Sequence, residues 1–272
     1  MILSNYHTHT VLCDGSNTMG EFAEAAIAAG FHSLGFSGHG RVPFESVAYG
    51  MAPEAARLYR EGLVALKAEY AGRLDIFCGL ENDSAYMHPA DGYDYTIGSV
   101  HCIKHGGEYY SVDSSVDSVE RAVAEAFNGD GEAFAEAYFG TVAEFASIRR
   151  ADILGHIDLV RRFNTGGKRL FDESDPRYCS AAKAAMENAV RSGYIIEVNT
   201  APLAKGFSDE PYPAVFLLKY ASELGARVMV NSDAHTVKNL NCAFGMAEAL
   251  LRGIGFKERW ELTPDGFVPT AV

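Results

Sequence analysis

The chain has 272 residues, 48% of them hydrophobic, and 36 acidic against 23 basic side chains give a formal net charge of −13. This length suits one α/β barrel, so we expect a single domain over residues 1–272. The charge repels polyanions and argues against nucleic acid or an anionic membrane as the main partner. A small anionic substrate remains compatible, because bound cations can reverse the sign of the field locally.

The cysteine pattern is typical of a reduced protein. The five cysteines are odd in number and none are spaced as CxxC, so a disulfide framework is not indicated. The chain shows no basic leader followed by an apolar segment, and no apolar run approaches about 18 residues. We therefore expect a cytoplasmic protein with no membrane partner.

Apolar runs rich in β-branched and aromatic residues alternate with segments of helical period. Strands are predicted at 2–6, 33–37, 74–80, 94–100, 152–155, 194–199 and 226–231. Helices are predicted from a capping box at Thr18, from Pro53 to Gly72, and at 117–128, 132–149, 176–192, 212–224 and 239–253. Strict alternation predicts a parallel sheet. Seven strands favour a closed or nearly closed barrel, although a doubly wound sheet has the same alternation.

Two segments depart from this alternation. Residues 102–150 hold two helical patterns between consecutive strands, and such an excursion often forms a wall or lid over a site. The tail from Phe256 to Val272 contains Pro264-Asp265-Gly266 between apolar residues, which predicts a short hairpin.

Histidines and carboxylates recur where the predicted strands end. Imidazoles and carboxylates at successive strand ends are how a barrel builds a metal site at one rim. The residues in these positions are His7, His9, His39, Glu81, His101, His156, Asp233 and His235.

The spacing of two pairs strengthens this interpretation. His7 and His9 lie in an extended segment, so both rings point to one face, about 6.6 Å apart along the chain. Asp233 and His235 repeat the same spacing after a very apolar strand. The alternatives are a surface pair for the first and a turn-forming Asp with an exposed His for the second. Glu81, considered alone, is more typical of a solvated residue.

The other positions are less specific on their own. His101 and His156 are each as consistent with a structural histidine as with a ligand. His39 has glycines on both sides, which leaves room for close approach. Asp14-Gly15 is equally consistent with a ligand and with an ordinary Asp-Gly turn.

Such a set of donors suits metal-assisted hydrolysis. Histidine and carboxylate ligands without cysteine suit zinc, manganese or iron, and we expect two to three divalent ions. Clustered ions generate hydroxide near neutral pH, hold phosphate oxygens and stabilise a leaving alkoxide. Hydrolysis of a phosphate monoester is therefore the expected reaction, with no Ser, Cys or Asp nucleophile.

The ordered motifs resemble those of the polymerase and histidinol phosphatase (PHP) family, and most of all its histidinol-phosphate phosphatases. The resemblance covers essentially the whole chain. It implies a distorted seven-stranded, TIM-like (β/α)7 barrel that hydrolyses L-histidinol phosphate to L-histidinol and phosphate in histidine biosynthesis. The motifs are His7-Thr8-His9-Thr10, Asp14-Gly15, Gly79-Leu80-Glu81, Ser99-Val100-His101, Gly155-His156-Ile157-Asp158, Asn199-Thr200-Ala201 and Ser232-Asp233-Ala234-His235.

The resemblance also implies a trinuclear centre with a definite assignment of ligands. The first ion would take His7, His9, Glu81 and Asp233. The second would take Glu81, His101 and His156. The third would take Asp14, His39 and His235.

Basic residues that bind the phosphate are implied at Arg161, Arg162 and Lys205. Ala204 stands where relatives carry an arginine, which leaves Lys205 without the bidentate grip of a guanidinium. Gly38 stands where relatives carry an acidic residue.

The remaining roles are left open at this point. Asp233 or His235 would act as the catalytic acid that protonates the leaving alcohol. A carboxylate must also meet the substrate's amine, and the sequence does not choose among Asp113, Asp158 and Glu197.

The sequence is also compatible with two alternatives to the histidinol-phosphate assignment. The departures at Ala204 and Gly38 are consistent with a phosphatase of the same family that acts on another small monoester. A non-enzymatic, metal-binding regulatory module is the second alternative, but all the expected ligand positions are filled. An exonuclease conflicts with the acidic balance of the chain.

Overall fold

Seven parallel strands form the central sheet, as the alternation predicted. A computed structural model describes residues 1–44, 47–164 and 170–272. Every pairing in the sheet is parallel. The strands, in spatial order, are β1 (Ser4–Asn5), β2 (Ser33–Phe36), β3 (Asp75–Asp83), β4 (Tyr95–Ser99), β7 (Ile153–Leu154), β8 (Ile195–Asn199) and β9 (Arg227–Asn231).

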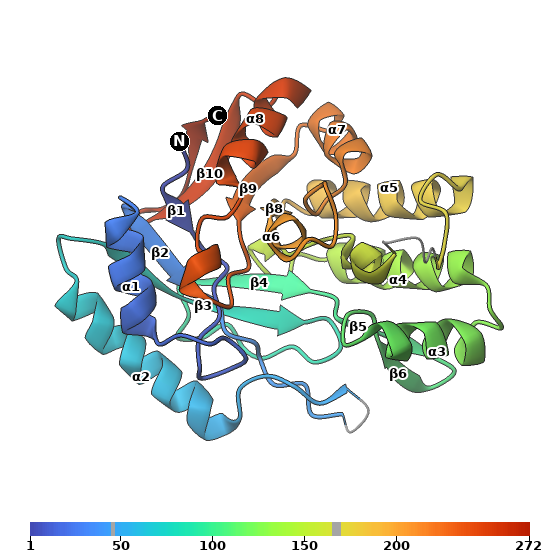
Figure 1. The fold of residues 1–272 in the computed structure, drawn as a ribbon, viewed down its shortest axis with the longest axis horizontal. Coiled ribbons are helices and arrows are strands. Elements are labelled where there is room, and N and C mark those ends of the chain that lie inside the picture. The colour runs from blue at the N-terminus through green and yellow to red at the C-terminus, as the bar shows by residue number, and fades with distance from the viewer. Residues whose placement is uncertain (45–46, 165–169) are drawn as a thin grey trace.

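Helices connect these strands and lie outside the sheet (Figure 1). The longer helices are α1 (Met19–Ala28), α2 (Pro53–Glu69), α3 (Val116–Ala126), α4 (Gly131–Ala146), α5 (Pro176–Arg191), α7 (Val215–Glu223) and α8 (Phe244–Ile254). Shorter turns of helix are η2 (Leu159–Phe163), α6 (Ala201–Lys205) and η3 (Val237–Asn239).

The predicted helices are present, with shifted ends. The capping box at Thr18 is formed, since Thr18 N–H donates to Glu21 Oε2 at 2.7 Å and Glu21 N–H donates to Thr18 Oγ1 at 3.3 Å. Helix α8 begins at Phe244 and not at residue 239, because Val237–Asn239 forms a separate 3₁₀ turn. The short helix α6 was not predicted.

The barrel closes between its first and last strands. Beyond β1 and β9, Thr8 and Ala234 form a parallel bridge. His9 N–H donates to Ala234 O at 2.9 Å, and Ala234 N–H donates to His7 O at 3.0 Å. The closed alternative is therefore correct, and the closing hydrogen bonds involve the same residues that carry the predicted metal ligands.

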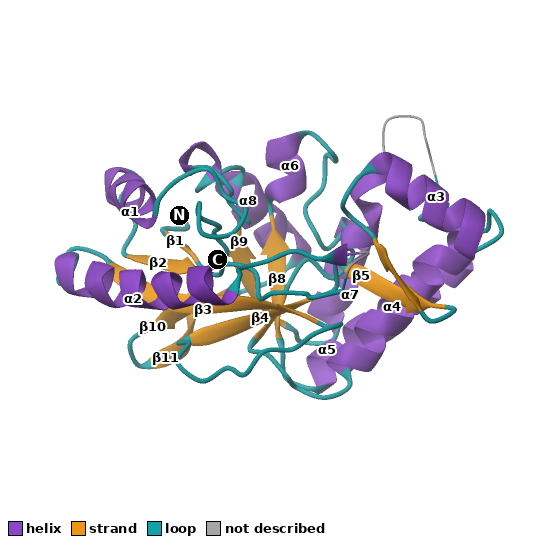
Figure 2. Ribbon diagram, turned by 90° about the horizontal axis from the view of Figure 1, so that it is seen from below, coloured by secondary structure: helices purple, strands orange, loops and turns teal. Residues whose placement is uncertain are grey.

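The excursion between β4 and β7 contains a hairpin as well as the two predicted helices (Figure 2). Strand β5 (Cys102–His105) pairs antiparallel with β6 (Glu108–Ser111). Gly106 and Gly107 connect them with φ of 58° and 95°, the left-handed conformation that glycine adopts without strain. The Gly-Gly pair was the sequence signal for this hairpin, which the analysis of helical period missed.

The barrel interior is closed at the end away from the site by the C-terminal hairpin, which confirms the predicted tail. Strands β10 (Glu258–Thr263) and β11 (Gly266–Ala271) pair antiparallel. Leu262 packs with the interior side chains of the strands, among them Tyr6, Phe77 and Tyr95. Tyr6 also donates its hydroxyl to Leu262 O at 2.9 Å.

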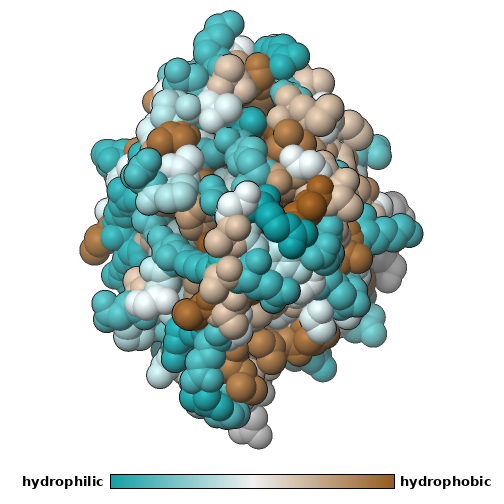
Figure 3. Space-filling model, turned by 90° about the vertical axis from the view of Figure 1, so that its left-hand side faces the viewer, coloured by the Kyte–Doolittle hydropathy of each residue, from teal (hydrophilic) through white to brown (hydrophobic). Residues whose placement is uncertain are grey.

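The molecular surface is mostly polar on the side drawn in Figure 3, where hydrophobic side chains form small separate groups. Within residues 1–44, 47–164 and 170–272, no helix is both long and apolar enough to cross a bilayer.

Tyr95 ties three strands together across the barrel interior. Its hydroxyl lies 2.5 Å from Tyr6 O and 3.1 Å from Phe36 O, and its ring occupies space that a Cβ on Gly35 or Gly79 would fill. We expect Tyr95→Phe to lower the free energy of unfolding by about 1–3 kcal/mol, because buried carbonyls lose a donor. Urea unfolding measures this. The control is Tyr86→Phe, on a side chain that is 43% exposed, and an equal loss in both variants would contradict the assignment.

Candidate metal centre

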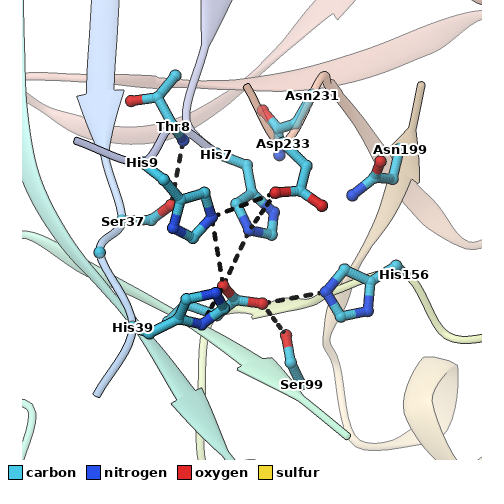
Figure 4. A network of polar contacts seen from close by, with 12 residues as sticks. His7, Thr8, His9, Ser37, His39, Ser99, His156, Asn199, Asn231 and Asp233 are labelled. Carbon is cyan, nitrogen blue, oxygen red and sulfur yellow. Dashed lines mark hydrogen bonds and ion pairs between the residues drawn. The ribbon is translucent and has the colours of Figure 1, made fainter. Parts of the chain in front are cut away.

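The structure brings all of the predicted ligand residues to one rim of the barrel. They follow or end β1, β2, β3, β4, β7 and β9, at the carboxyl ends of the strands where barrel sites form. Figure 4 shows His7, His9, His39 and Asp233 gathered there. The residues gathered there are His7, His9, Asp14, His39, Glu81, His101, His156, Asp233 and His235.

Glu81 lies at the centre of this group and is 1% exposed. Its Oε2 lies 3.1 Å from His7 Nε2, 3.5 Å from His9 Nε2 and 2.9 Å from His39 Nδ1. The strand β3 carries Glu81 in its interior, because it continues to Asp83 and not only to residue 80 as predicted. Backbone pairing with β4 therefore fixes the carboxylate.

The other oxygen of Glu81 faces a second set of side chains. Its Oε1 lies 3.0 Å from His156 Nε2 and 3.3 Å from His101 Nε2. Ser99 Oγ donates to the same oxygen at 2.7 Å. One carboxylate thus stands between two groups of imidazoles, which is the geometry of a ligand shared by two cations.

Asp233 forms the opposite side of the first group. Its Oδ1 lies 3.2 Å from His9 Nε2, 3.7 Å from His7 Nε2 and 3.4 Å from His235 Nδ1. The backbone of Asp233 has a φ of 49°, an uncommon conformation for a residue other than glycine. Such conformations cluster at functional sites, where the surrounding structure holds them.

Asp14 joins a third group at the outer edge. Its Oδ2 lies 3.1 Å from His235 Nε2 and 3.5 Å from His39 Nε2. The segment is also a turn, since Gly15 N–H donates to Thr10 O at 3.0 Å. The ligand and turn interpretations of Asp14-Gly15 are therefore compatible, because the turn directs the carboxylate to the two imidazoles.

The donor atoms fit divalent metal ions. Four buried polar atoms of the centre, His7 Nε2, His9 Nε2, His39 Nδ1 and Glu81 Oε2, have no hydrogen-bond partner among the described residues. Buried polar atoms normally find partners, and a cation bound by His7, His9 and Glu81 would satisfy three of the four. Groups with donors within 4.8 Å of one another are His9, Asp14, His39 and His235; His7, His9 and Asp233; His7, Glu81 and His156; and His39, Glu81 and His101.

The ionisation of these groups also suits cation binding. Burial by itself raises the pKa of Glu81, but the imidazoles of His39, His7 and His101 hold it well below its usual range. Burial, together with the neighbouring His235 and His39, lowers the pKa of His9 to about 3. Glu81 is therefore ionised and His9 neutral near neutral pH, which are the forms that bind metals. Burial lowers the pKa values of His7 and His39, but the neighbouring carboxylates, Glu197 for His7 and Glu81 for His39, raise them above their usual range, so these two rings would release a proton on binding a metal.

Glu197 forms hydrogen bonds with two of the ligand residues, His7 and His156. It is 0% exposed, and its Oε1 lies 2.6 Å from His7 Nδ1. Its Oε2 accepts from the backbone N–H of His156 at 2.9 Å. Asn199 and Asn231 donate their side-chain amides to the two oxygens at 3.0 and 2.9 Å. Glu197 is thus fully engaged inside the barrel, which removes it from the candidates for contact with a substrate amine.

The sequence analysis also missed Asp83 and Tyr49. Asp83 Oδ2 accepts from His101 N–H at 2.9 Å and lies 3.1 Å from His101 Nδ1. Tyr49 donates its hydroxyl to the same oxygen at 2.7 Å. Asp83 is two residues after Glu81 in one strand, so period-two alternation was the signal that it faces the same side. These partners orient the His101 ring.

A cavity of about 430 Å³ opens beside the centre. Its lining contains polar and charged side chains from the loop after β2, the excursion and η2. The lining residues are Asp14, His39, Val47, Ala48, Tyr49, His101, Ser111, Asp113, Ser114 and Arg162.

The structure separates the two arginines that were predicted to bind phosphate. Arg162 lines the cavity, whereas Arg161 is buried against the carboxylates of Asp158 and Glu173. Arg161 donates to Asp158 at 3.2 Å and to Glu173 at 2.6 Å, and it is 7% exposed. Consecutive residues on a 3₁₀ helix point about 120° apart, so only one of the pair can face the cavity.

Lys205 is exposed at the end of α6. Burial raises the pKa of Asp233, but His7, His9, His235 and, last among these causes, the charge of Lys205 lower it. A Cβ on Gly38 would lie 3.1 Å from Met51 Cε, so a side chain at this position would require Met51 to shift. The ring of His39 is held instead by Glu81, whose Oε2 lies 2.9 Å from His39 Nδ1.

Comparison with known proteins agrees with this geometry. The family model described as "PHP domain" matches residues 5–201. A Deinococcus radiodurans protein named "Probable histidinol-phosphatase" is 31% identical over 266 residues, covering 93% of this chain and 94% of that protein. The "Histidinol-phosphatase" of Bacillus subtilis is 26% identical over 261 residues, covering 88% of this chain and 95% of that protein.

Among solved structures, the histidinol phosphate phosphatase of Lactococcus lactis has a similar fold. It was determined in complex with zinc, L-histidinol and phosphate. The TM-score is 0.74 at 19% identity, and the alignment covers 97% of this chain and 98% of that chain.

Glu197→Gln tests the support behind the ligands. We expect this variant to bind zinc about 10- to 100-fold more weakly, because the amide loses the charge that orients His7. Equilibrium dialysis against a zinc chelator measures the affinity. Glu223→Gln, on an exposed residue of α7, is the matched control. Unchanged zinc affinity in Glu197→Gln would show that Glu197 is only a packing residue.

Proposed function

The chain belongs to the PHP domain family, and we propose that it is a metal-dependent phosphatase that hydrolyses L-histidinol phosphate to L-histidinol and phosphate. The observation that carries the proposal is the buried Glu81 carboxylate between imidazoles on both sides. Relatives named as histidinol-phosphatases over nearly the whole chain support the substrate. We take residues 1–272 as one catalytic domain and the cytoplasm as its compartment, in keeping with five free thiols.

The proposed ligand sets follow the groups in the structure. Zinc, manganese or iron, when bound, would supply Lewis acidity toward the phosphate and lower the pKa of water. The sets are His7, His9, Glu81 and Asp233 for one ion, Glu81, His101 and His156 for a second, and Asp14, His39 and His235 for a third.

The chain's own residues then bind and orient the substrate. Arg162 lines the cavity next to His39 and His101, which supports a role for its guanidinium in holding phosphate oxygens. Lys205 adds a second positive charge on the side of Asp233. Together they fix the phosphorus atom for in-line attack by water.

Asp233 is the proposed proton carrier. Its contacts with His7, His9 and His235 all involve Oδ1, so Oδ2 remains to exchange a proton. Burial raises the pKa of Asp233, but these imidazoles hold it well below its usual range, so the group is ionised. In this proposal its Oδ2 takes up a proton from the attacking water. It then returns that proton to the leaving alkoxide, with His235 beside it as the second candidate acid.

Phosphate release tests the proposed substrate and its dependence on metal. We expect the protein, with its metal content counted, to release phosphate from L-histidinol phosphate faster than from sugar phosphates and nucleotides. A chelator should abolish turnover, and added Zn²⁺ or Mn²⁺ should restore it, because the centre supplies the charge that the reaction needs. Undiminished activity without metal would contradict the mechanism. Activity on other phosphate esters only would show that L-histidinol phosphate is not the substrate.

Replacement of ligands tests the centre itself. We expect His9→Ala and Asp233→Ala each to lower kcat/KM by about 1,000-fold or more and to reduce the bound metal, because both residues face the same ion. Metal analysis and steady-state kinetics measure the two effects. The control is His32→Ala, whose side chain is 52% exposed and lies away from the rim. Normal turnover and metal content in Asp233→Ala would reject the ligand assignment.

A further inference from the structure

The cavity beside the metal centre carries one positive and one negative side chain in contact with each other. Arg162 Nη1 lies 3.2 Å from Asp113 Oδ2, and both residues line the cavity with His39 and His101. We propose that Asp113 is the specificity-determining residue that accepts the ammonium group of the substrate, so that the site selects phosphate esters of amino alcohols. The inference rests on the proposed phosphatase function.

Arg162 is held in a fixed position at this site. Its guanidinium carbon lies 5.3 Å from the ring centroid of Phe163 and 5.3 Å from that of Phe207. Rings on a guanidinium restrict its orientation while leaving its N–H groups at the edges. Arg162 is therefore a preorganised anchor for the phosphate, and Asp113 marks a fixed point beside that anchor.

Asp113 is also positioned by its own segment. It follows β6 of the excursion, and Ser111 Oγ donates to its Oδ1 at 3.1 Å. The side chain is 20% exposed. An ionised carboxylate has about four acceptor sites, and Ser111 and Arg162 use two of them. The carboxylate therefore keeps capacity for the N–H groups of a ligand in the cavity.

The other candidate carboxylates do not line the cavity. Asp158 is 0% exposed, and its Oδ2 accepts from Arg161 and from the backbone N–H of Ala214 at 2.8 Å. Glu197 is enclosed behind the metal ligands. Among the described residues that line the cavity, the carboxylates are Asp14 and Asp113, and Asp14 faces His39 and His235. Asp113 is thus the one outside the metal groups.

The arrangement also discriminates against esters that lack an amine. A sugar phosphate or nucleotide would displace water from Asp113 without providing a positive charge, and an unpaired desolvated carboxylate beside a phosphate is unfavourable. A zwitterionic substrate satisfies both partners, since its phosphate pairs with Arg162 and its ammonium with Asp113. Selection therefore has an attractive and a repulsive part.

The test compares L-histidinol phosphate with its desamino analogue, an imidazolylpropyl phosphate. We expect the wild-type protein to prefer the amino ester in kcat/KM by about 10- to 100-fold, the range for a hydrogen bond to a charged group. Asp113→Asn should lower this preference at least about tenfold. Because a shift of Arg162 would affect both esters, it cancels in the ratio. Asp113→Glu, which keeps the charge, should retain part of the preference.

The control is Asp117→Asn, an exposed carboxylate in the first turn of α3, and it should keep the wild-type preference. A preference in Asp113→Asn within about twofold of wild type, or an equal loss on both esters, would overturn this inference alone. Release of phosphate from neither ester by the wild-type protein would overturn the proposed substrate together with it.

Discussion

The burial of one negative charge is the constraint on which this structure depends. Glu81 is 1% exposed, and an isolated carboxylate at such a position would be strongly unfavourable. It is tolerated because imidazoles from four strand ends surround it, and those donors leave buried atoms that a cation satisfies. The buried charge of Glu81 therefore accounts both for the imidazoles that surround it and for the requirement for a metal ion.

The barrel carries the metal ligands, whereas the excursion carries the residue proposed to determine substrate specificity. Hydrogen bonds that close the barrel run through His7, His9 and Ala234, and Glu197 links β8 to the ligands on either side. The reacting groups are thus held by hydrogen bonds within the barrel itself. Asp113 comes instead from the excursion, outside the ring of strands. Substrate preference can change there without disturbing the metal ligands, as expected where loops rest on a scaffold.

Much of the fold and nearly all of the candidate centre could be predicted from the sequence, because their signals are local. Hydrophobic period identified the seven strands and the longer helices, and a polar residue at the end of an apolar run marks the rim of a barrel. The spacing of His7 and His9 already places both rings on one face. The hairpin at Gly106 was missed although its signal is local, because helical period was given more weight than the turn residues.

Other features were decided by tertiary structure alone. Arg161 and Arg162 are equivalent in the sequence, but packing of η2 buries one among carboxylates and exposes the other to the cavity. Asp113 and Glu197 were equal candidates for the substrate amine, and only the positions of β6 and β8 separate them. The sequence by itself determined which chemistry the strand ends carry, since that depends on residue type and local period. Which side chain meets which partner depends on contacts between distant segments, and only the folded chain fixes these.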